Sequence, residues 1–133
     1  MTVRHLIRNV LLLGVAAVTP VVTAACERSG ESYRAAAALT GGDPRRGRSI
    51  MSKYGCDSCH TIPGIRGANA LVGPPLDRIG ARMYLAGRLP NTPENMLLWI
   101  RTPQQVDPKN AMPDTGVTNE DARDIAAYLY TLR

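Results

Sequence analysis

The chain has 133 residues, of which 44% are hydrophobic, and a formal net charge of +5. This length allows a single modest hydrophobic core and excludes a protein of several large domains. There is no Phe, one Trp and five Tyr, so the core lacks bulky side chains, and a large apolar cofactor would supply the missing volume. Arginines cluster near residues 45–48 and 78–88, but turn residues interrupt them and aromatic platforms are absent. We therefore predict a solvated face or docking rim and no nucleic-acid partner.

Residues 1–25 have the organisation of an export signal. A basic start, Arg4 to Arg8, precedes the apolar run Val10 to Val22, and the small residues 23–25 follow. The apolar run is shorter than the roughly 20 residues that a membrane-spanning helix needs. We predict a cleaved signal peptide, with an uncleaved anchor as the alternative.

Cys26 directly follows this segment, and the stretch Val22 to Cys26 resembles a bacterial lipoprotein box. The resemblance implies that Cys26 is lipidated and becomes the mature N-terminus; the alternative is an unlipidated residue near an ordinary cleavage site. Cys26 has no obvious disulfide partner, since the other two cysteines share a motif. We therefore expect an exported protein in the periplasm or on the outer face of the cytoplasmic membrane, held there by an N-terminal lipid.

Residues 26–42 predict a linker, because they lack a sustained apolar stripe, with partial helicity at Ala35 to Ala38. A domain is expected over residues 43–133. Its first helix begins at Asp43-Pro44, an N-cap acid followed by proline, and runs to Tyr54 before Gly55 ends it.

The remaining elements are short. Pro63 to Pro75 predicts a loop and Leu76 to Tyr84 a short helix. Thr92 begins a helix that is apolar nearly all round, which predicts burial, and Thr102-Pro103 ends it. A second loop, 103–116, leads to a last helix that Thr118 caps. A chain this short, with short helices joined by long loops, needs a bound group at its centre to stay ordered.

The motif that carries chemistry is Cys56-Asp57-Ser58-Cys59-His60, a C-x-x-C-H sequence that attaches c-type haem. Cys56 and Cys59 reach the two vinyl groups of one porphyrin edge, while His60 binds the iron. One covalent haem c is therefore expected. A structural zinc would need four ligands, but the mature chain has neither a second cysteine pair nor a second histidine. A thioredoxin-like pair would follow a strand, whereas a helix is predicted here.

The absence of a second mature histidine excludes bis-His coordination, so the sixth position holds Met, a weaker group or nothing. Met51, Met83 and Met96 belong to apolar helical stretches, where Met commonly packs. Met112 lies before Pro113 in a loop, from which a thioether can reach across the haem. We predict Met112 as the second metal ligand beside His60.

Five segments occur in a familiar order: Gly55 to His60, Gly73-Pro74-Pro75-Leu76, Leu89 to Asn95, Met112-Pro113 and Ala126 to Leu129. Through them the chain from about Gly42 resembles class I c-type cytochromes, closest to the cytochrome c domains of caa-type oxidases and related small bacterial mono-haem cytochromes. The resemblance implies an all-α fold, a small cytochrome c fold of about three to five short helices wrapped around one haem, with long loops.

The resemblance also implies roles in the haem pocket. Pro74 would offer its carbonyl to the second imidazole nitrogen of His60 and fix the tautomer. Trp99 would pack beside the Met ligand, with ordinary core packing as the alternative. Gly47 would allow the first helix to cross the last closely at Ile125.

The expected function is electron transport without catalysis: single electrons pass through a His/Met haem between respiratory partners such as a terminal oxidase, a quinol:cytochrome c reductase or a dehydrogenase. The alternative is a tightly bound cytochrome subunit of an oxidase or dehydrogenase complex. A di-haem peroxidase would need a second C-x-x-C-H motif, which the sequence lacks.

Overall fold

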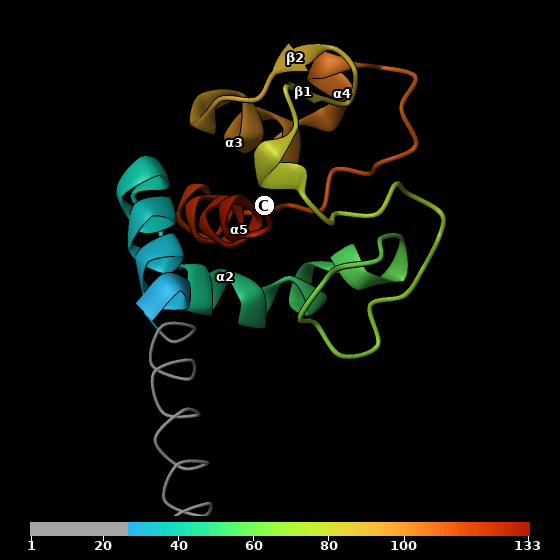
Figure 1. The fold of residues 1–133 in the computed structure, drawn as a ribbon. Coiled ribbons are helices and arrows are strands. Elements are labelled where there is room, and N and C mark those ends of the chain that lie inside the picture. The colour runs from blue at the N-terminus through green and yellow to red at the C-terminus, as the bar shows by residue number, and fades with distance from the viewer. Residues whose placement is uncertain (1–26) are drawn as a thin grey trace, which may run out of the picture. The chain divides into compact units, whose positions relative to one another are not determined.

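The computed structural model describes residues 27–133, and Figure 1 shows their elements. The predicted signal peptide, 1–25, and the predicted lipid anchor, Cys26, lie outside the described residues. The chain divides into two units, Met1–Ser32 and Tyr33–Arg133, and the labelled helices and strands described below belong to the second. In the described part, no helix is long and apolar enough to cross a membrane.

The segment predicted as a linker is more regular than expected, because residues 27–40 are helical throughout. Ala36 is only 2% exposed and joins the hydrophobic core, and the Thr40 hydroxyl donates to its carbonyl at 3.0 Å. The compact unit consequently begins at Tyr33, earlier than the boundary predicted at residue 43. Alanine favours helix strongly, and its small side chain permits this packing.

Helix α2 spans Pro44–Ile50 and begins where the sequence predicts. The Asp43 carboxylate accepts from the backbone N–H of Arg45 at 2.8 Å, and proline occupies the first turn. A 3₁₀ helix, Ser52–Tyr54, continues the segment. Gly55 ends it at φ 72°, a left-handed conformation that favours glycine.

The middle of the chain is mostly irregular. It contains an isolated bridge between Thr61 and Asn69 and an antiparallel hairpin of strands β1, Tyr84–Leu85, and β2, Leu89–Pro90. The helix predicted over Leu76 to Tyr84 is wrong: the structure has only a 3₁₀ turn, Ile79–Ala81. Arg78 has φ 52°, which interrupts any right-handed helix there.

Three helices complete the fold: α3, Pro93–Arg101; α4, Pro103–Val106; and α5, Asn119–Thr131. The hydroxyls of Thr92 and Thr118 cap α3 and α5, as predicted. The burial predicted for α3 all round is wrong, since Leu98 is 39% exposed. Helix α4 was not predicted.

The core is built on α5, which Figure 1 shows between α2 and α3 and which contacts both. Its buried residues are Asp121, Ala122 and the run Asp124 to Tyr130. Gly47 permits the α2–α5 crossing, because a Cβ at this position would lie 1.9 Å from the carbonyl oxygen of Asp124. The all-α prediction is confirmed, and the hairpin is the only sheet in the part of the chain that is described.

A polar cluster fastens this crossing. Asp121 and Asp124 are 4% and 5% exposed, and Arg46 forms ion pairs with both. The second Asp124 oxygen accepts from the Asp43 N–H at 2.6 Å, and the Tyr54 hydroxyl donates to Asp121. The cluster thus connects α5 to both ends of the segment that leads into the cysteine motif.

Candidate functional site

The two motif cysteines lie in one tight turn. After Gly55, a 3₁₀ helix, Cys56–Ser58, turns the chain, and the backbone N–H of His60 donates to the Cys56 carbonyl at 3.0 Å. Both thiols, of Cys56 and Cys59, are free and half-buried. Two thiols and one imidazole therefore project from a single turn.

The ring of His60 is held in one orientation. Its Nδ1 lies 2.7 Å from the carbonyl oxygen of Pro74, and because a carbonyl only accepts, Nδ1 carries the proton. The Nε2 lone pair is left available to a metal. The Pro74 contact implied by the resemblance is thus present.

Gly73 makes this arrangement possible. Its N–H donates to the Cys59 carbonyl at 2.7 Å, which brings the chain close under the motif. A Cβ at position 73 would lie 2.4 Å from the Cε1 atom of His60. Gly73 is part of the quoted family pattern, but only its distance from the imidazole reveals why no side chain fits there.

The electrostatics of the turn favour a protonated thiol. Burial, with a smaller contribution from the Asp57 carboxylate, raises the pKa of Cys56 to about 11. Among residues 27–133, no three His, Cys, Asp or Glu side chains come together as a metal site. The motif also follows helical segments, which disfavours the thioredoxin-like alternative.

Met112 lies in the predicted loop between α4 and α5, half-buried. Its N–H donates to the side-chain oxygen of Asn110 at 2.7 Å, and its carbonyl accepts from Gln104 at 2.5 Å. Asn110 in turn donates to the Pro103 carbonyl at 3.0 Å. The backbone of Met112 is therefore fixed by side chains that sequence reasoning missed, although Asn and Gln near a proline-bounded loop are typical of such bonds. No hydrogen bond joins Met112 to His60.

The other methionines differ in burial. Met51 and Met96 are each 1% exposed and belong to the core, as their predicted packing role requires. Met83 is 80% exposed, so the packing role predicted for it is wrong. It lies just before β1.

Trp99 is half-buried on α3, three residues after Met96 and next to the buried Ile100. Its indole N–H has no hydrogen-bond partner in the described part of the chain. This position agrees with packing of Trp99 at the margin of the core. That Trp99 packs beside the Met ligand stays a prediction.

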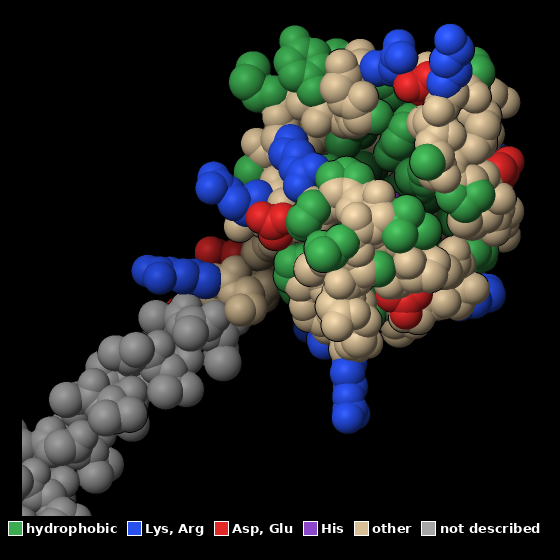
Figure 2. All heavy atoms as spheres, turned by 90° about the vertical axis from the view of Figure 1, so that its right-hand side faces the viewer, with side chains coloured by type: hydrophobic (Ala, Val, Ile, Leu, Met, Phe, Trp, Pro, Cys, Tyr) green, Lys and Arg blue, Asp and Glu red, His purple; other side chains and the backbone are tan. Residues whose placement is uncertain are grey.

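These residues fit a covalently bound haem. The turn presents two free thiols and an imidazole whose Nε2 has no hydrogen-bond partner among the described residues. Gly73 has no side chain and so leaves space for the imidazole ring of His60. Figure 2 shows a hollow in the surface whose visible walls are hydrophobic side chains, and an apolar porphyrin needs walls of this kind. Cys56 and Cys59 would hold the group covalently and His60 would bind its iron.

A small helical fold with such a turn and an apolar hollow defines a haem protein of the c type. The family model for cytochrome c matches residues 44–133. The chain belongs to the cytochrome c family, and the resemblance to class I c-type cytochromes is confirmed. Haem-based electron transfer by covalently attached haem c follows from this membership.

Three relatives are similar to part of the chain, and each is a cytochrome c oxidase subunit 2. The protein of Alkalihalophilus pseudofirmus is 35% identical over 89 residues, 66% of this chain and 25% of the relative. The protein of Bacillus sp. PS3 is 32% identical over 93 residues, which cover 67% of this chain and 26% of the relative. The protein of Bacillus subtilis is 30% identical over 88 residues, which cover 65% of this chain and 25% of the relative. The chain thus spans about a quarter of the length of these relatives. No solved structure gives a significant match.

Proposed function

We propose that the protein is an exported, lipid-anchored carrier of single electrons that binds one haem through Cys56, Cys59, His60 and Met112. The observation that carries the proposal is the motif turn, in which the Pro74 carbonyl accepts from Nδ1 of His60 at 2.7 Å. This bond selects the tautomer that leaves Nε2 for iron. A second fixed ligand in the loop at residue 112 would close the iron to substrates.

The chain's own residues keep the site unchanged between redox states. His60 is restrained by a backbone carbonyl and by Gly73, and Met112 by Asn110 and Gln104. Restrained ligands need little rearrangement when an electron arrives or leaves. A haem bound there would supply one-electron exchange at iron, and ligation by the Met112 thioether would raise its potential relative to a bis-His haem.

We infer that a terminal oxidase is among its partners, because the relatives named above are subunits of cytochrome c oxidase. A quinol:cytochrome c reductase or a dehydrogenase would supply the electrons. The protein would act as a carrier and not as an enzyme, on the periplasmic or outer side of the cytoplasmic membrane, to which the lipid on Cys26 would hold it.

The test of the haem site is extraction of the purified protein with acidified acetone. One haem per chain should stay with the wild type and with Cys26→Ser, the control that keeps both motif cysteines. It should be lost from the double variant Cys56→Ala, Cys59→Ala. Extractable haem in the wild type would contradict the proposal.

A second candidate is a subunit held permanently in an oxidase complex, which the same relatives favour. Purification from the native membrane in mild detergent separates the two candidates. A carrier should elute alone and exchange electrons with added oxidase at a rate that depends on its concentration. Co-elution with oxidase subunits at fixed stoichiometry would establish the subunit instead.

A further inference from the structure

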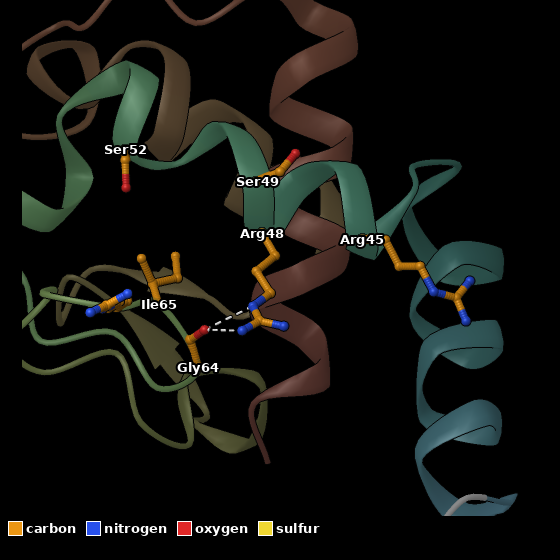
Figure 3. A pocket seen from close by; sticks show the side chains of 7 residues that line it. Arg45, Arg48, Ser49, Ser52, Gly64 and Ile65 are labelled. Carbon is orange, nitrogen blue, oxygen red and sulfur yellow. Dashed lines mark hydrogen bonds between the residues drawn. The ribbon is translucent and has the colours of Figure 1, made fainter.

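A second concave site lies apart from the motif. It is an open pocket of about 430 Å³ between α2 with its 3₁₀ extension and the loop at Gly64, shown in Figure 3. The residues that line it are Arg45, Arg48, Ser49, Ser52, Gly64, Ile65 and Arg66. They include three arginines and two serines but no acidic side chain and none of the proposed haem ligands, so the pocket is basic and separate.

One face of the first helical segment forms one wall. Arg45, Arg48 and Ser52 follow at spacings of three and four residues, which places them on the same side. In Figure 3, Ser52 and Arg48 point toward the loop, while Arg45 points away toward the preceding helix. The Arg45 guanidinium lies 5.5 Å from the ring centroid of Tyr33, so it adds positive potential without facing the pocket.

Arg48 closes one end of the pocket. Its Nε donates to the Gly64 carbonyl at 2.8 Å, and its Nη2 donates to the same oxygen. Because both bonds use one edge of the guanidinium, Nη1 remains available as a donor. The loop is thereby held opposite Ser52.

The Ser49 hydroxyl donates to the Arg46 carbonyl at 2.7 Å, but two other donors of the lining, Arg66 and Ser52, have no partner in the described part of the chain. Arg66 is exposed and forms neither a hydrogen bond nor an ion pair there, and the Ser52 hydroxyl makes no hydrogen bond. By contrast, Arg46 and Arg88 each pair with a carboxylate. The pocket therefore gathers positive charge and free donors without an internal counter-ion.

We propose that this pocket binds a phosphate-class anion, with Arg66, Nη1 of Arg48 and the Ser52 hydroxyl as donors. Guanidinium forks match the tetrahedral oxygens of phosphate in charge and geometry. The pocket volume lies in the range of organic-ligand sites, so it accepts a phosphate ester such as a lipid headgroup as well as the free ion. The lining residues 45–52 come before Cys56 in the chain and the lining residues 64–66 come after His60. A bound anion would therefore connect the two segments that flank the motif. This proposal does not depend on the proposed function.

The test is thermal unfolding of the haem-loaded full chain in rising inorganic phosphate, against chloride at equal ionic strength. Phosphate should raise the unfolding temperature saturably, as binding to the native state requires. Arg66→Ala and Ser52→Ala should weaken phosphate binding, the former by about tenfold or more. Arg123→Ala, which removes the same charge from an exposed position on α5, should bind as the wild type does. Equal effects of phosphate and chloride, or equal binding by Arg66→Ala and Arg123→Ala, would overturn the proposal.

Vesicles identify the source of the phosphate. The Cys26→Ser protein, which has no lipidation site at residue 26, is sedimented with phosphatidylglycerol or phosphatidylcholine vesicles. Preference for phosphatidylglycerol that Arg66→Ala abolishes and Arg123→Ala retains indicates a lipid headgroup. Saturable binding of inorganic phosphate without this preference indicates the free ion.

Discussion

At the residue scale, the site depends on contacts of single atoms. The carbonyl of Pro74 decides which nitrogen of His60 carries the proton, and the hydrogen of Gly73 leaves room for the ring. Met112 is held through its backbone, so its thioether is free to act as a ligand while the chain around it stays fixed.

Replacing Met112 with Ala tests this ligand assignment. The iron should open, so the ferric protein should lose its weak sulfur-to-iron charge-transfer band and bind cyanide or carbon monoxide readily. The potential should fall, because the thioether favours the ferrous state. Absorption spectra and redox titration measure both effects.

The matched controls are Met51→Leu, Met83→Leu and Met96→Leu, which keep approximate volume. Each should retain the band and cost less than about 1.5 kcal/mol of stability. A band that survives Met112→Ala and disappears in one of these controls would transfer the ligand role to that methionine.

At the scale of elements, the crossing of α2 and α5 determines where the motif turn begins. Gly47 brings the two backbones together, and Arg46 neutralises two buried carboxylates on α5. Breaking such a buried pair leaves an uncompensated charge. The crossing is therefore sensitive both to side-chain volume and to charge.

Gly47→Ala should destabilise the protein although alanine is the better helix former. The propensity gain is about 1 kcal/mol, but the added Cβ would lie 1.9 Å from a backbone oxygen, and such overpacking costs about 1–3 kcal/mol or more. Urea unfolding measures the difference. Ser49→Ala, on the exposed side of α2, should change stability by less than about 0.5 kcal/mol. A more stable Gly47→Ala protein would show that the helices can separate without loss.

Asp121→Asn tests the charge of the crossing through pH. The hydrogen bond from Tyr54, and then the charges of Arg46 and Lys53, hold the pKa of Asp121 below its ordinary 3.8. A lowered folded-state pKa contributes stability that is present above the ordinary value and is lost as the pH falls through it toward the folded value. The wild type should therefore lose stability below about pH 4, measured as the urea midpoint against pH.

In Asp121→Asn this acid loss should be smaller, and the protein should already be less stable at pH 7. Glu120→Gln changes the neighbouring carboxylate, whose side chain is 76% exposed, and should keep the wild-type pH profile. Identical acid profiles for Asp121→Asn and the wild type would remove Asp121 from the explanation.

At the scale of the whole molecule, short helices alternate with long loops, and Figure 2 shows a surface hollow with hydrophobic side chains on its walls. The core has few large aromatic side chains, so the proposed haem would contribute much of the buried apolar surface. The proposed lipid tether belongs to residues before Glu27, which lie outside the described part of the chain, so only the sequence supports it.

Cys26→Ser tests the tether. Radiolabelled fatty acid should enter the wild type and not the variant, since the thiol is the proposed attachment point. The variant should also move to the soluble fraction, because a lipid chain is what would hold the protein at the membrane. Cys59→Ser, which leaves the proposed lipid site intact, should still be labelled. Label retained in Cys26→Ser would indicate an anchor elsewhere or an uncleaved signal.

The sequence by itself determined the helix starts at Asp43, Thr92 and Thr118, the haem motif and the all-α class, because capping bonds and motif spacing act over a few residues. It misplaced a helix near Arg78, where the backbone turns left-handed. It also missed the bonds around Met112, which depend on the fold of its loop.

Only the tertiary structure decided the longer-range contacts. Arg46 meets Asp121 and Asp124 across 75 and 78 residues, and Arg48 meets Gly64 across a loop. Such partners come together only after α2 has crossed α5, and many side chains in the sequence could have served equally well. Local bonding preferences therefore predict where elements begin, whereas packing selects which distant residues meet.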